Sequence, residues 1–313
     1  MNGAHLGVDV GGTKVAVRLE SADGSVVHED AFTWAAGADV AVDVAMLARG
    51  ARALATRWDG SIGGIGVAMP ATVDAAGRVT AWPNRPSWVG LDLTAALAGL
   101  VPGAPVAHAD DGDLAALAEA AAAGVDDLLY LGVGTGIGGG IIHGGRIWPG
   151  PDRGSCEIGH LVVALDGPVC GCGRRGCVQA IASGPATLRR AGAYRSGADA
   201  GPVEYAELRD GWLEGTPWAT AALAESARAL ATAIAGIGEL AHPALAVVGG
   251  GFADGLAGFA DAVAAATADL TRPGHPTPAV EPARLGGLSS LRGALELARR
   301  LGAAASRLQP RLD

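Results

Sequence analysis

The segment Leu6-Gly-Val-Asp-Val-Gly-Gly-Thr-Lys-Val-Ala-Val-Arg-Leu19 contains two apolar runs separated by a glycine pair. Apolar and polar residues alternate after Lys14, which is typical of a strand, and Gly11-Gly12 favours a tight turn. The segment therefore predicts two neighbouring strands joined by a short loop. A second turn at Asp23-Gly24 precedes the strand-like residues Val26–Phe32, so we expect an antiparallel three-stranded start.

A similar pattern recurs in the second half of the chain. Asp127–Val133 is a strand-like run, and it leads into the glycine-rich loop Gly132-Val-Gly-Thr-Gly-Ile-Gly-Gly-Gly140. Both loops place a Gly-Thr pair between apolar strands, with the threonines at positions 13 and 135. We interpret this as a faint internal repeat of one strand–turn–strand unit in each of two domains.

The remaining patterns alternate between helix and strand, which favours an α/β fold. Helices are expected over Ala38–Trp58, Gly112–Ala123, a stretch near Asp254–Leu270, and Ser289–Leu301; strands are expected over Ile65–Met69, Pro105–Asp110 and Ala244–Val248. The last helix is expected to fold back on the first domain.

Composition excludes several classes of protein. The chain has 313 residues, enough for two domains, and 50% of them are hydrophobic, which excludes intrinsic disorder. The formal charge is −9 without blocks of like sign, so neither a nucleic acid nor an anionic membrane is an expected partner. No apolar run approaches the roughly 18–20 residues of a membrane span, and no signal peptide is visible, so a cytoplasmic location is expected.

Three glycine-rich loops follow predicted strands and could bind phosphate groups. Glycine lets backbone N–H groups approach phosphate oxygens, because no β-carbon stands in the way. The candidates are Gly11, Gly12, Thr13 and Lys14 in the first loop, Gly134, Thr135 and Gly136 in the second, and Gly249, Gly250 and Gly251 in the third. An ordinary hairpin turn would explain any one of these loops alone. Neither of the first two fits the P-loop or the dinucleotide fingerprint, so we expect phosphates held between two related domains.

Three of the four cysteines are crowded together. Cys170, Cys172 and Cys177 begin ten residues after His160, and the four side chains can supply a tetrahedral Cys₃His set for Zn²⁺. Four protein ligands leave no open coordination position, so such an ion would be structural. Unliganded thiols or a disulfide are the alternatives. Cys156 lacks the spacing and is expected to be a small buried side chain.

Four motifs occur in order: Asp9-Val-Gly-Gly-Thr-Lys14, Gly134-Thr-Gly136, Glu157-Ile-Gly-His160 and Cys170-Gly-Cys-Gly-Arg-Arg-Gly-Cys177. Together they resemble the ROK family of sugar kinases and repressors, closest to its bacterial glucokinase-type members. The resemblance implies an actin-like/ribonuclease-H-like (ASKHA) α/β fold with two lobes around an ATP cleft. The small lobe would comprise residues 1–109 and 294–313 with the first phosphate loop, and the large lobe residues 110–293.

The resemblance also implies roles for individual residues. Asp111 would be the catalytic base with Asp113 in support, Asp9 would help to hold Mg²⁺, and Gly249–Gly251 would lie near the nucleoside of ATP. The sugar substrate would be bound by Asn84, Asp110, Asp111, Glu157, His160 and Gln179. A homodimer is implied as well. From composition alone, the N-cap of the following Ala/Leu helix is the favoured explanation of an aspartate at this point. For Asp9 the alternative is a buried aspartate paired with backbone amides in a turn.

Two positions depart from the pattern of the sugar kinases. Asp110 stands where they usually have Asn, and Gln179 where they usually have Glu. An ionised carboxylate only accepts hydrogen bonds, so Asp110 favours a partner rich in donors such as an ammonium group. We therefore expect phosphorylation of the 6-hydroxyl of an amino sugar such as 3-amino-3-deoxyglucose (kanosamine). Glucose and a cyclitol are the alternative acceptors.

Two other classes of protein compete with an enzyme. The family includes DNA-binding repressors, which carry an additional helix-turn-helix segment of about 50 residues; here the first strand is expected by residue 6. A sugar sensor without turnover is the other class, and the presence of Asp9, Asp111 and both phosphate loops argues against it.

Overall fold

The computed structural model describes residues 3–82, 84–150 and 154–308. The chain forms two compact units. The first unit comprises residues 1–118, 149–155 and 288–313, and the second comprises residues 119–148 and 156–287. The boundary lies inside helix α3 (Asp111–Ala123), whereas the sequence placed it at residue 110. Asp110 and Asp111 therefore belong to the first unit.

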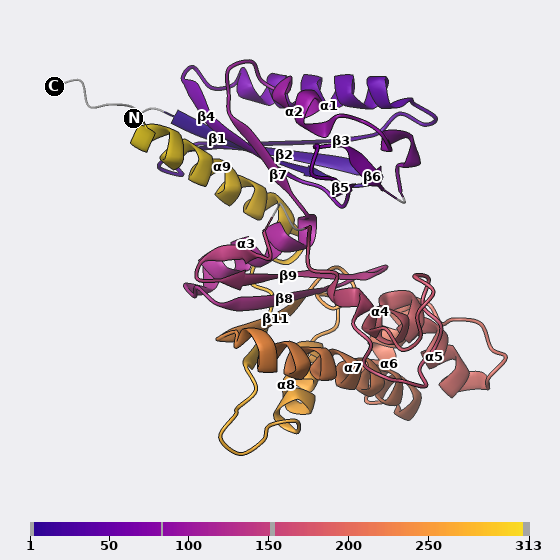
Figure 1. Cartoon of the computed structure of the whole chain (residues 1–313). Helices are drawn as coiled ribbons and strands as arrows, with labels where there is room; N and C mark the ends of the chain where they lie inside the picture. Colours follow the sequence, from indigo (N-terminus) through magenta and orange to yellow (C-terminus); the bar gives the residue numbers. More distant parts are fainter. Residues whose placement is uncertain (1–2, 83, 151–153, 309–313) are drawn as a thin grey trace. The chain divides into compact units, whose positions relative to one another are not determined.

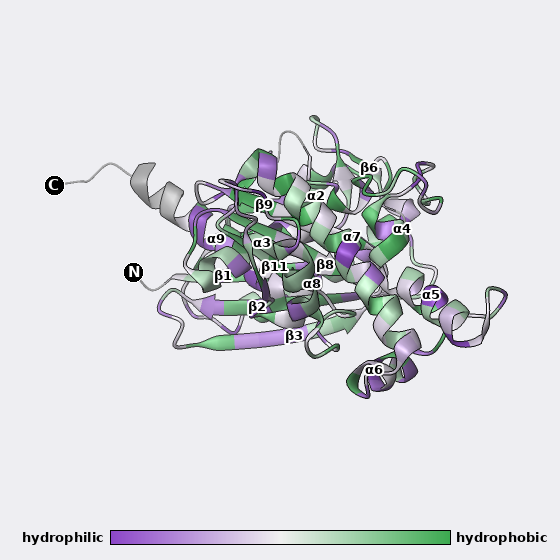
Figure 2. Ribbon diagram, turned by 90° about the horizontal axis from the view of Figure 1, so that it is seen from below, coloured by the Kyte–Doolittle hydropathy of each residue, from purple (hydrophilic) through white to green (hydrophobic). Residues whose placement is uncertain are grey.

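The first unit is built on a five-stranded sheet in the order β3-β2-β1-β4-β7. Its strands are β1 (Gly3–Val10), β2 (Lys14–Ser21), β3 (Val27–Thr33), β4 (Ser61–Ala68) and β7 (Val106–Ala109). The first three strands pair antiparallel, and β4 and β7 extend the sheet in parallel with β1. The predicted three-stranded start is confirmed. The edge strand β3 is hydrophilic at its centre (Figure 2), which discourages pairing with another chain.

Helices cover both faces of this sheet (Figure 1). Helices α1 (Val40–Ala55) and α2 (Leu93–Ala98) lie on one face, and α9 (Ser289–Leu308) lies on the other. Helix α9 packs directly on the backbone of β1 and β4: a β-carbon at Gly66 would lie 1.9 Å from the carbonyl oxygen of Ala294. The prediction that the closing helix returns to the first domain is confirmed.

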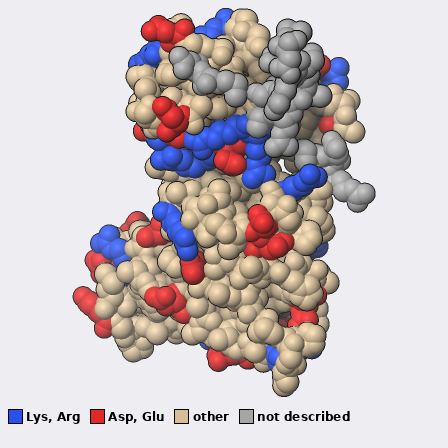
Figure 3. Space-filling view, turned by 90° about the vertical axis from the view of Figure 1, so that its left-hand side faces the viewer, with Lys and Arg blue, Asp and Glu red and all other residues tan. Residues whose placement is uncertain are grey.

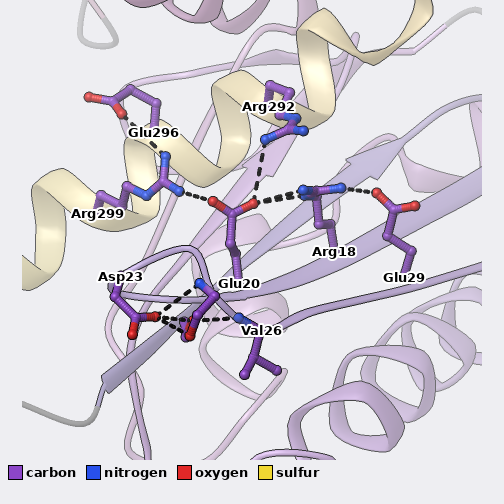
Figure 4. A network of polar contacts seen from close by, with 10 residues as sticks. Arg18, Glu20, Asp23, Val26, Glu29, Arg292, Glu296 and Arg299 are labelled. Atoms are coloured by element: carbon purple, nitrogen blue, oxygen red, sulfur yellow. Dashed lines mark hydrogen bonds and ion pairs between the residues drawn. The ribbon is translucent and has the colours of Figure 1, made fainter.

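A buried carboxylate holds α9 against β2 (Figure 4). Glu20 on β2 is 6% exposed and accepts hydrogen bonds from Arg18 on its own strand and from Arg292 and Arg299 on α9. Arg18 also pairs with Glu29 on β3. Glu20 therefore joins β2 to the C-terminal helix, and Arg18 extends this network to β3 through a second carboxylate, Glu29.

The second unit repeats the topology of the first. Its sheet has the order β10-β9-β8-β11-β12, formed by β8 (Leu128–Val133), β9 (Ile137–His143), β10 (Arg146–Trp148), β11 (Leu245–Gly249) and β12 (Ala279–Pro282). Again the first three strands along the chain pair antiparallel and the last two extend the sheet in parallel. The internal repeat that the sequence suggested is therefore present in both sheets.

The second unit contains more helix than the sequence indicated. Its helices are α4 (Val178–Ala182), α5 (Gly184–Ser196), α6 (Tyr205–Leu213), α7 (Pro217–Ala241) and α8 (Phe259–Ala268). Helices α4 to α7 were not expected from the sequence, and the helix expected near Asp254 begins only at Phe259. No helix among the described residues is long and apolar enough to cross a membrane.

Smaller elements complete the two units. They are the two-stranded sheet of β5 (Thr72–Val73) and β6 (Val79–Ala81) and the 3₁₀ helices η1 (Pro86–Trp88), η3 (Ile158–His160) and η4 (Gly286–Leu288). On the face seen in Figure 3, Lys and Arg side chains gather in one band with acidic side chains among them.

Candidate active site and metal centre

The first glycine loop connects β1 to β2 as a tight turn. The N–H of Gly11 donates to the carbonyl oxygen of Lys14 at 3.0 Å. Asn84 lies against this turn, because a β-carbon at Gly12 would be 2.6 Å from the β-carbon of Asn84. Thr13 and Lys14 are exposed. The structure thus brings the candidate phosphate residues of this loop together with one candidate sugar residue.

Two candidate carboxylates, Asp9 near the end of β1 and Asp111 at the start of α3, influence each other. Burial, and after it the negative charge of Asp111, raise the pKa of Asp9 to about 6, and the positive charge of Lys14 opposes both effects. Burial also raises the pKa of Asp111, against a smaller lowering effect of the Gly112 backbone N–H. Buried like charges of this kind are common at sites that bind cations or transfer protons.

Asp110 caps helix α3. Its Oδ1 atom accepts a hydrogen bond of 3.0 Å from the N–H of Gly112. The capping alternative that the sequence left open is therefore realised at Asp110. Asp113, one turn into the helix, is buried. A contact between Asp110 and a sugar stays a prediction.

The second and third glycine loops meet within the second unit. The N–H of Gly134 donates to the carbonyl oxygen of Gly136 at 2.9 Å, and Phe252, which follows the third loop, donates its N–H to the carbonyl oxygen of Val133. Gly250 has a φ of 92°, and a β-carbon there would lie 2.6 Å from the backbone nitrogen of Val133. Only glycine fits this close approach, so the two loops form one surface of backbone.

Gln179 on α4 connects this surface to the motif that begins at Glu157. Its Oε1 atom accepts a hydrogen bond of 3.0 Å from the N–H of Ile137, the residue after the second loop. The same atom lies 3.2 Å from the position of a β-carbon at Gly159, inside η3. Glu157 immediately precedes η3 and is exposed, and His160 ends it.

The predicted zinc ligands converge. The ligand atoms of His160, Cys170, Cys172 and Cys177 all lie within 4.8 Å of one another. The Sγ atoms of Cys172 and Cys177 are 3.7 Å apart, and Nδ1 of His160 is 3.6 Å from Sγ of Cys170. Bonds of about 2.3 Å to sulfur and 2.0–2.1 Å to nitrogen in a tetrahedron predict separations of about 3.8 and 3.6 Å. The donor set therefore fits Zn²⁺.

The state of the thiols agrees with a metal site. All four cysteines are free, so the structure contains no disulfide. The backbone N–H of Arg174 lowers the pKa of the Cys172 thiol to about 7, which favours the thiolate that binds metal, whereas burial raises the pKa of the Cys177 thiol to about 11. Cys156 is half-buried, and its Sγ atom is 3.0 Å from the carbonyl oxygen of Trp148.

The structure also shows contacts that the sequence analysis missed. Trp34 and Arg85 donate hydrogen bonds to carbonyl oxygens of the first glycine loop, and Gly184 donates its N–H to the carbonyl oxygen of Gly134 in the second. Trp34 directly follows β3, and Arg85 directly follows Asn84. The sequence held one signal for these two contacts: Trp34 and Arg85 lie next to a predicted strand and to a predicted sugar-binding residue.

A model of the ROK family matches residues 5–301. The chain is 53% identical to a kanosamine kinase of Amycolatopsis mediterranei (strain S699) over 294 residues, which are 94% of this chain and 95% of that protein.

Solved structures agree in fold. The chain is similar to a ROK hexokinase from Thermus thermophilus with a TM-score of 0.82 and 32% identity, covering 95% of this chain and 98% of that one. It is also similar to a ROK family glucokinase from Streptomyces griseus in complex with glucose and AMPPNP, with a TM-score of 0.75 and 28% identity. This similarity covers 95% of this chain and 100% of the glucokinase chain. These similarities confirm the predicted ASKHA-type α/β fold.

Proposed function

The chain belongs to the ROK family and is a sugar kinase, and from this premise we propose that it transfers the terminal phosphoryl group of ATP to the 6-hydroxyl of an amino hexose. The preferred acceptor in this proposal is 3-amino-3-deoxyglucose (kanosamine). The observation that carries the choice of acceptor is the 53% identity, over 94% of this chain, to a protein named kanosamine kinase. An ordinary glucokinase is the second candidate, favoured by the similarity to a ROK glucokinase in complex with glucose and AMPPNP.

Asp111 is the general base of the proposed reaction. Its raised pKa, caused by burial, makes the ionised carboxylate a better proton acceptor than an exposed aspartate. Asp111 accepts the proton of the 6-hydroxyl while that oxygen forms a bond to the γ-phosphorus. The bond between the γ-phosphorus and the bridging oxygen breaks, and ADP leaves. The mutual influence of Asp9 and Asp111 supports a shared place in the reaction.

Asp9 is the residue assigned to Mg²⁺. Its carboxylate is largely buried beside a second carboxylate, and Lys14 offsets this charge only in part. A site with excess buried negative charge fits a divalent cation. When bound, Mg²⁺ neutralises charge on the transferred phosphate.

The loops Gly11–Lys14 and Gly134–Gly136 are assigned to the phosphates of ATP, through backbone N–H groups other than those of Gly11 and Gly134, which donate within their own turns. The loop Gly249–Gly251 is assigned to the nucleoside. The contact between the second and third loops supports this assignment, because one nucleotide could touch both. Asn84, Asp110, Glu157, His160 and Gln179 are assigned to the sugar. Gln179 would do so with atoms other than the Oε1 that holds Ile137.

Asp110 is proposed to select the amino sugar. A carboxylate accepts from an ammonium group, whereas the asparagine usual in the sugar kinases also donates. A hydrogen bond to a charged group contributes about 1.5–3 kcal/mol, or roughly 10- to 100-fold in selectivity. The cap formed with Gly112 fixes the carboxylate at the start of α3, which supports a directed contact.

We also propose that the protein binds one structural zinc ion and forms a homodimer. The site formed by His160, Cys170, Cys172 and Cys177 would hold one structural Zn²⁺, which would tie the loop of residues 170–177 to η3. Metal analysis of the purified protein tests the ion. The proposed homodimer is tested by sedimentation equilibrium.

A panel of acceptors tests the function. ADP release is measured with hexoses, amino hexoses and cyclitols, and the position of the new phosphate is determined by NMR. We expect the highest kcat/KM with kanosamine and a phosphate on carbon 6. Preference for glucose supports the second candidate, and absence of turnover with every acceptor refutes a kinase.

The variant Asp110→Asn tests the selecting residue without disturbing the helix, because asparagine is also a good N-cap. The ratio of kcat/KM for kanosamine to that for glucose should fall about 10- to 100-fold. Asp92→Asn is the matched control, since Asp92 caps α2 through the N–H of Ala95. An unchanged ratio in Asp110→Asn would remove Asp110 from the proposal.

A further inference from the structure

The carbonyl oxygens of the first glycine loop are held from outside the loop. The indole Nε1–H of Trp34 donates to the carbonyl oxygen of Gly11 at 2.8 Å, and its backbone N–H donates to that of Thr13 at 3.2 Å. Nε of Arg85 donates to the carbonyl oxygen of Gly12 at 3.2 Å. Three successive peptide groups are therefore fixed in orientation.

Arg85 is itself fixed by a buried carboxylate. Nη1 of Arg85 lies 2.6 Å from Oδ2 of Asp43, which also accepts the indole N–H of Trp88 at 2.9 Å. The side chain of Asp43 is fully buried on α1, and its Oδ1 atom has no hydrogen-bond partner among the described residues. The guanidinium also stacks on the ring of Trp34, 4.5 Å from the ring centroid.

This arrangement is costly if its only role is stability. Taking an Asp–Arg pair out of water costs several kcal/mol per ion, and apolar residues of similar size often stabilise a fold as well or better. An unpartnered carboxylate oxygen adds to that cost. A requirement for fixed geometry in the loop would explain why the pair of Asp43 and Arg85 lies here.

The geometry determines where the loop directs its donors. In a planar trans peptide the C=O and the following N–H point in opposite directions. Because the carbonyl oxygens of Gly11 and Gly12 point toward Trp34 and Arg85, the N–H groups of Gly12 and Thr13 point away from them. Preorganised backbone N–H groups bind phosphate better than mobile ones, because no ordering is needed on binding.

We propose that Trp34, Arg85 and Asp43 are positioning residues that hold the N–H groups of Gly12 and Thr13 toward the phosphates of the nucleotide. The proposal rests on the assignment of this loop to ATP under the proposed function. It predicts that losing one of these donors weakens nucleotide binding, while binding of the sugar is spared. A merely structural role predicts equal effects on both substrates or none.

The variant Trp34→Phe is the sharpest test, because it keeps an aromatic ring under Arg85 and removes one N–H. KM for ATP should rise about 3- to 10-fold, and KM for the sugar should stay within 2-fold. The Kd of AMPPNP, measured by calorimetry without sugar, should rise by the same factor. Trp58→Phe is the matched control, since the buried Nε1 of Trp58 has no hydrogen-bond partner among the described residues.

Arg85→Lys provides a second variant. Lysine keeps the positive charge beside Asp43 but cannot donate from a second nitrogen to Gly12, so KM for ATP should again rise. Arg52→Lys is its control, because Arg52 also donates to two backbone carbonyl oxygens, those of Gly99 and Leu100, outside the loop. If Arg85→Lys fails to fold, Trp34→Phe still decides.

The outcomes separate this inference from the proposed function. A parent protein that phosphorylates no acceptor refutes the function. An active parent whose Trp34→Phe variant binds AMPPNP with unchanged Kd refutes the positioning role and leaves the function standing. Equal rises in KM for ATP and for the sugar would also refute it, since they indicate general distortion.

Discussion

Replacing Asp111 by asparagine is expected to abolish phosphoryl transfer and, at the same time, to make the folded chain more stable at neutral and alkaline pH. The loss of a positioned general base lowers kcat by about 10²- to 10⁴-fold. The gain in stability arises because Asp111 is a buried carboxylate near Asp9, and asparagine removes its charge without changing its shape.

The size of the gain follows from the pKa of Asp9. Burial first, and the charge of Asp111 second, raise it from the ordinary value to about 6. A difference of that size corresponds to about 3 kcal/mol for Asp9, at about 1.4 kcal/mol per pKa unit. Removing the charge of Asp111 removes the part of this free energy that comes from its repulsion of Asp9. It also removes the cost of burying the charge of Asp111 itself. We expect a gain of about 1–3 kcal/mol, and a rise in Tm of about 2–4 °C per kcal/mol.

The sign of the pH dependence can be stated. A carboxyl group whose pKa is raised by folding destabilises the folded state above that raised pKa, and the effect vanishes as the pH falls below the pKa of the unfolded chain. The difference in Tm between Asp111→Asn and the parent should therefore be largest above about pH 6 and close toward pH 4.

Thermal unfolding from pH 4 to pH 8.5, in buffer without added Mg²⁺, measures this difference, and the coupled ADP assay measures turnover. Asp92→Asn, which changes the exposed cap of α2, should show no such pH dependence. Turnover at the parental rate in Asp111→Asn would refute its role as the base. An equal or lower Tm at pH 8 would refute the like-charge relation between Asp9 and Asp111.

Three further predictions concern the metal site and the packing of α9. Cys172→Ser should lower the amount of bound zinc, measured by metal analysis, and should also lower the Tm. Cys156→Ser is the control and should retain the metal. Full zinc content in Cys172→Ser would exclude Cys172 as a ligand. Glu20→Gln should destabilise the fold by about 3–5 kcal/mol in denaturant titrations, because Arg18, Arg292 and Arg299 lose their shared anion. Glu29 is half-exposed, so Glu29→Gln should have a much smaller effect. Similar values for the two variants would contradict the network around Glu20. Gly66→Ala should cost about 1–3 kcal/mol, because the new methyl group would meet the carbonyl oxygen of Ala294. Gly3→Ala serves as control, because a β-carbon there would meet only the carbonyl oxygen of Ser61, at an ordinary contact distance of 4.0 Å. Equal stability of the two variants would show that α9 does not pack this closely.

The fold could be predicted where the sequence has a clear period. The strand after the first glycine loop alternates apolar and polar residues, and the strands around the second loop are short apolar runs beside glycines. The structure confirms these strands and the common topology of the two sheets. Helix α7 has no such contrast. It is rich in alanine and buries neighbouring residues such as Ala229, Leu230 and Ala231, so no single face distinguishes it from a run of small apolar residues.

The members of a candidate site could be predicted from the sequence where they lie close together along the chain. The ligand set at His160, Cys170, Cys172 and Cys177 lies within 18 residues and converges as expected. The pair of Asp43 and Arg85 could not be found this way, because its members lie 42 positions apart and meet only in the folded unit. The contact of Gln179 with Ile137, whose residues lie 42 positions apart, could not be found either, whereas helix capping by an aspartate near residue 110 was open from the sequence and is realised at Asp110.

The position of α9 in the chain has a consequence for synthesis. The first sheet has its last neighbouring strand by Ala109, yet one of its faces is covered by a helix that begins at Ser289. At about 5–20 residues per second, a ribosome makes the intervening stretch in roughly 10–35 s. During that interval the nascent chain presents an uncovered apolar sheet, whereas every strand and helix of the second unit emerges before α9. The face of the first sheet that α9 covers is therefore the apolar surface of this chain that stays exposed longest during translation.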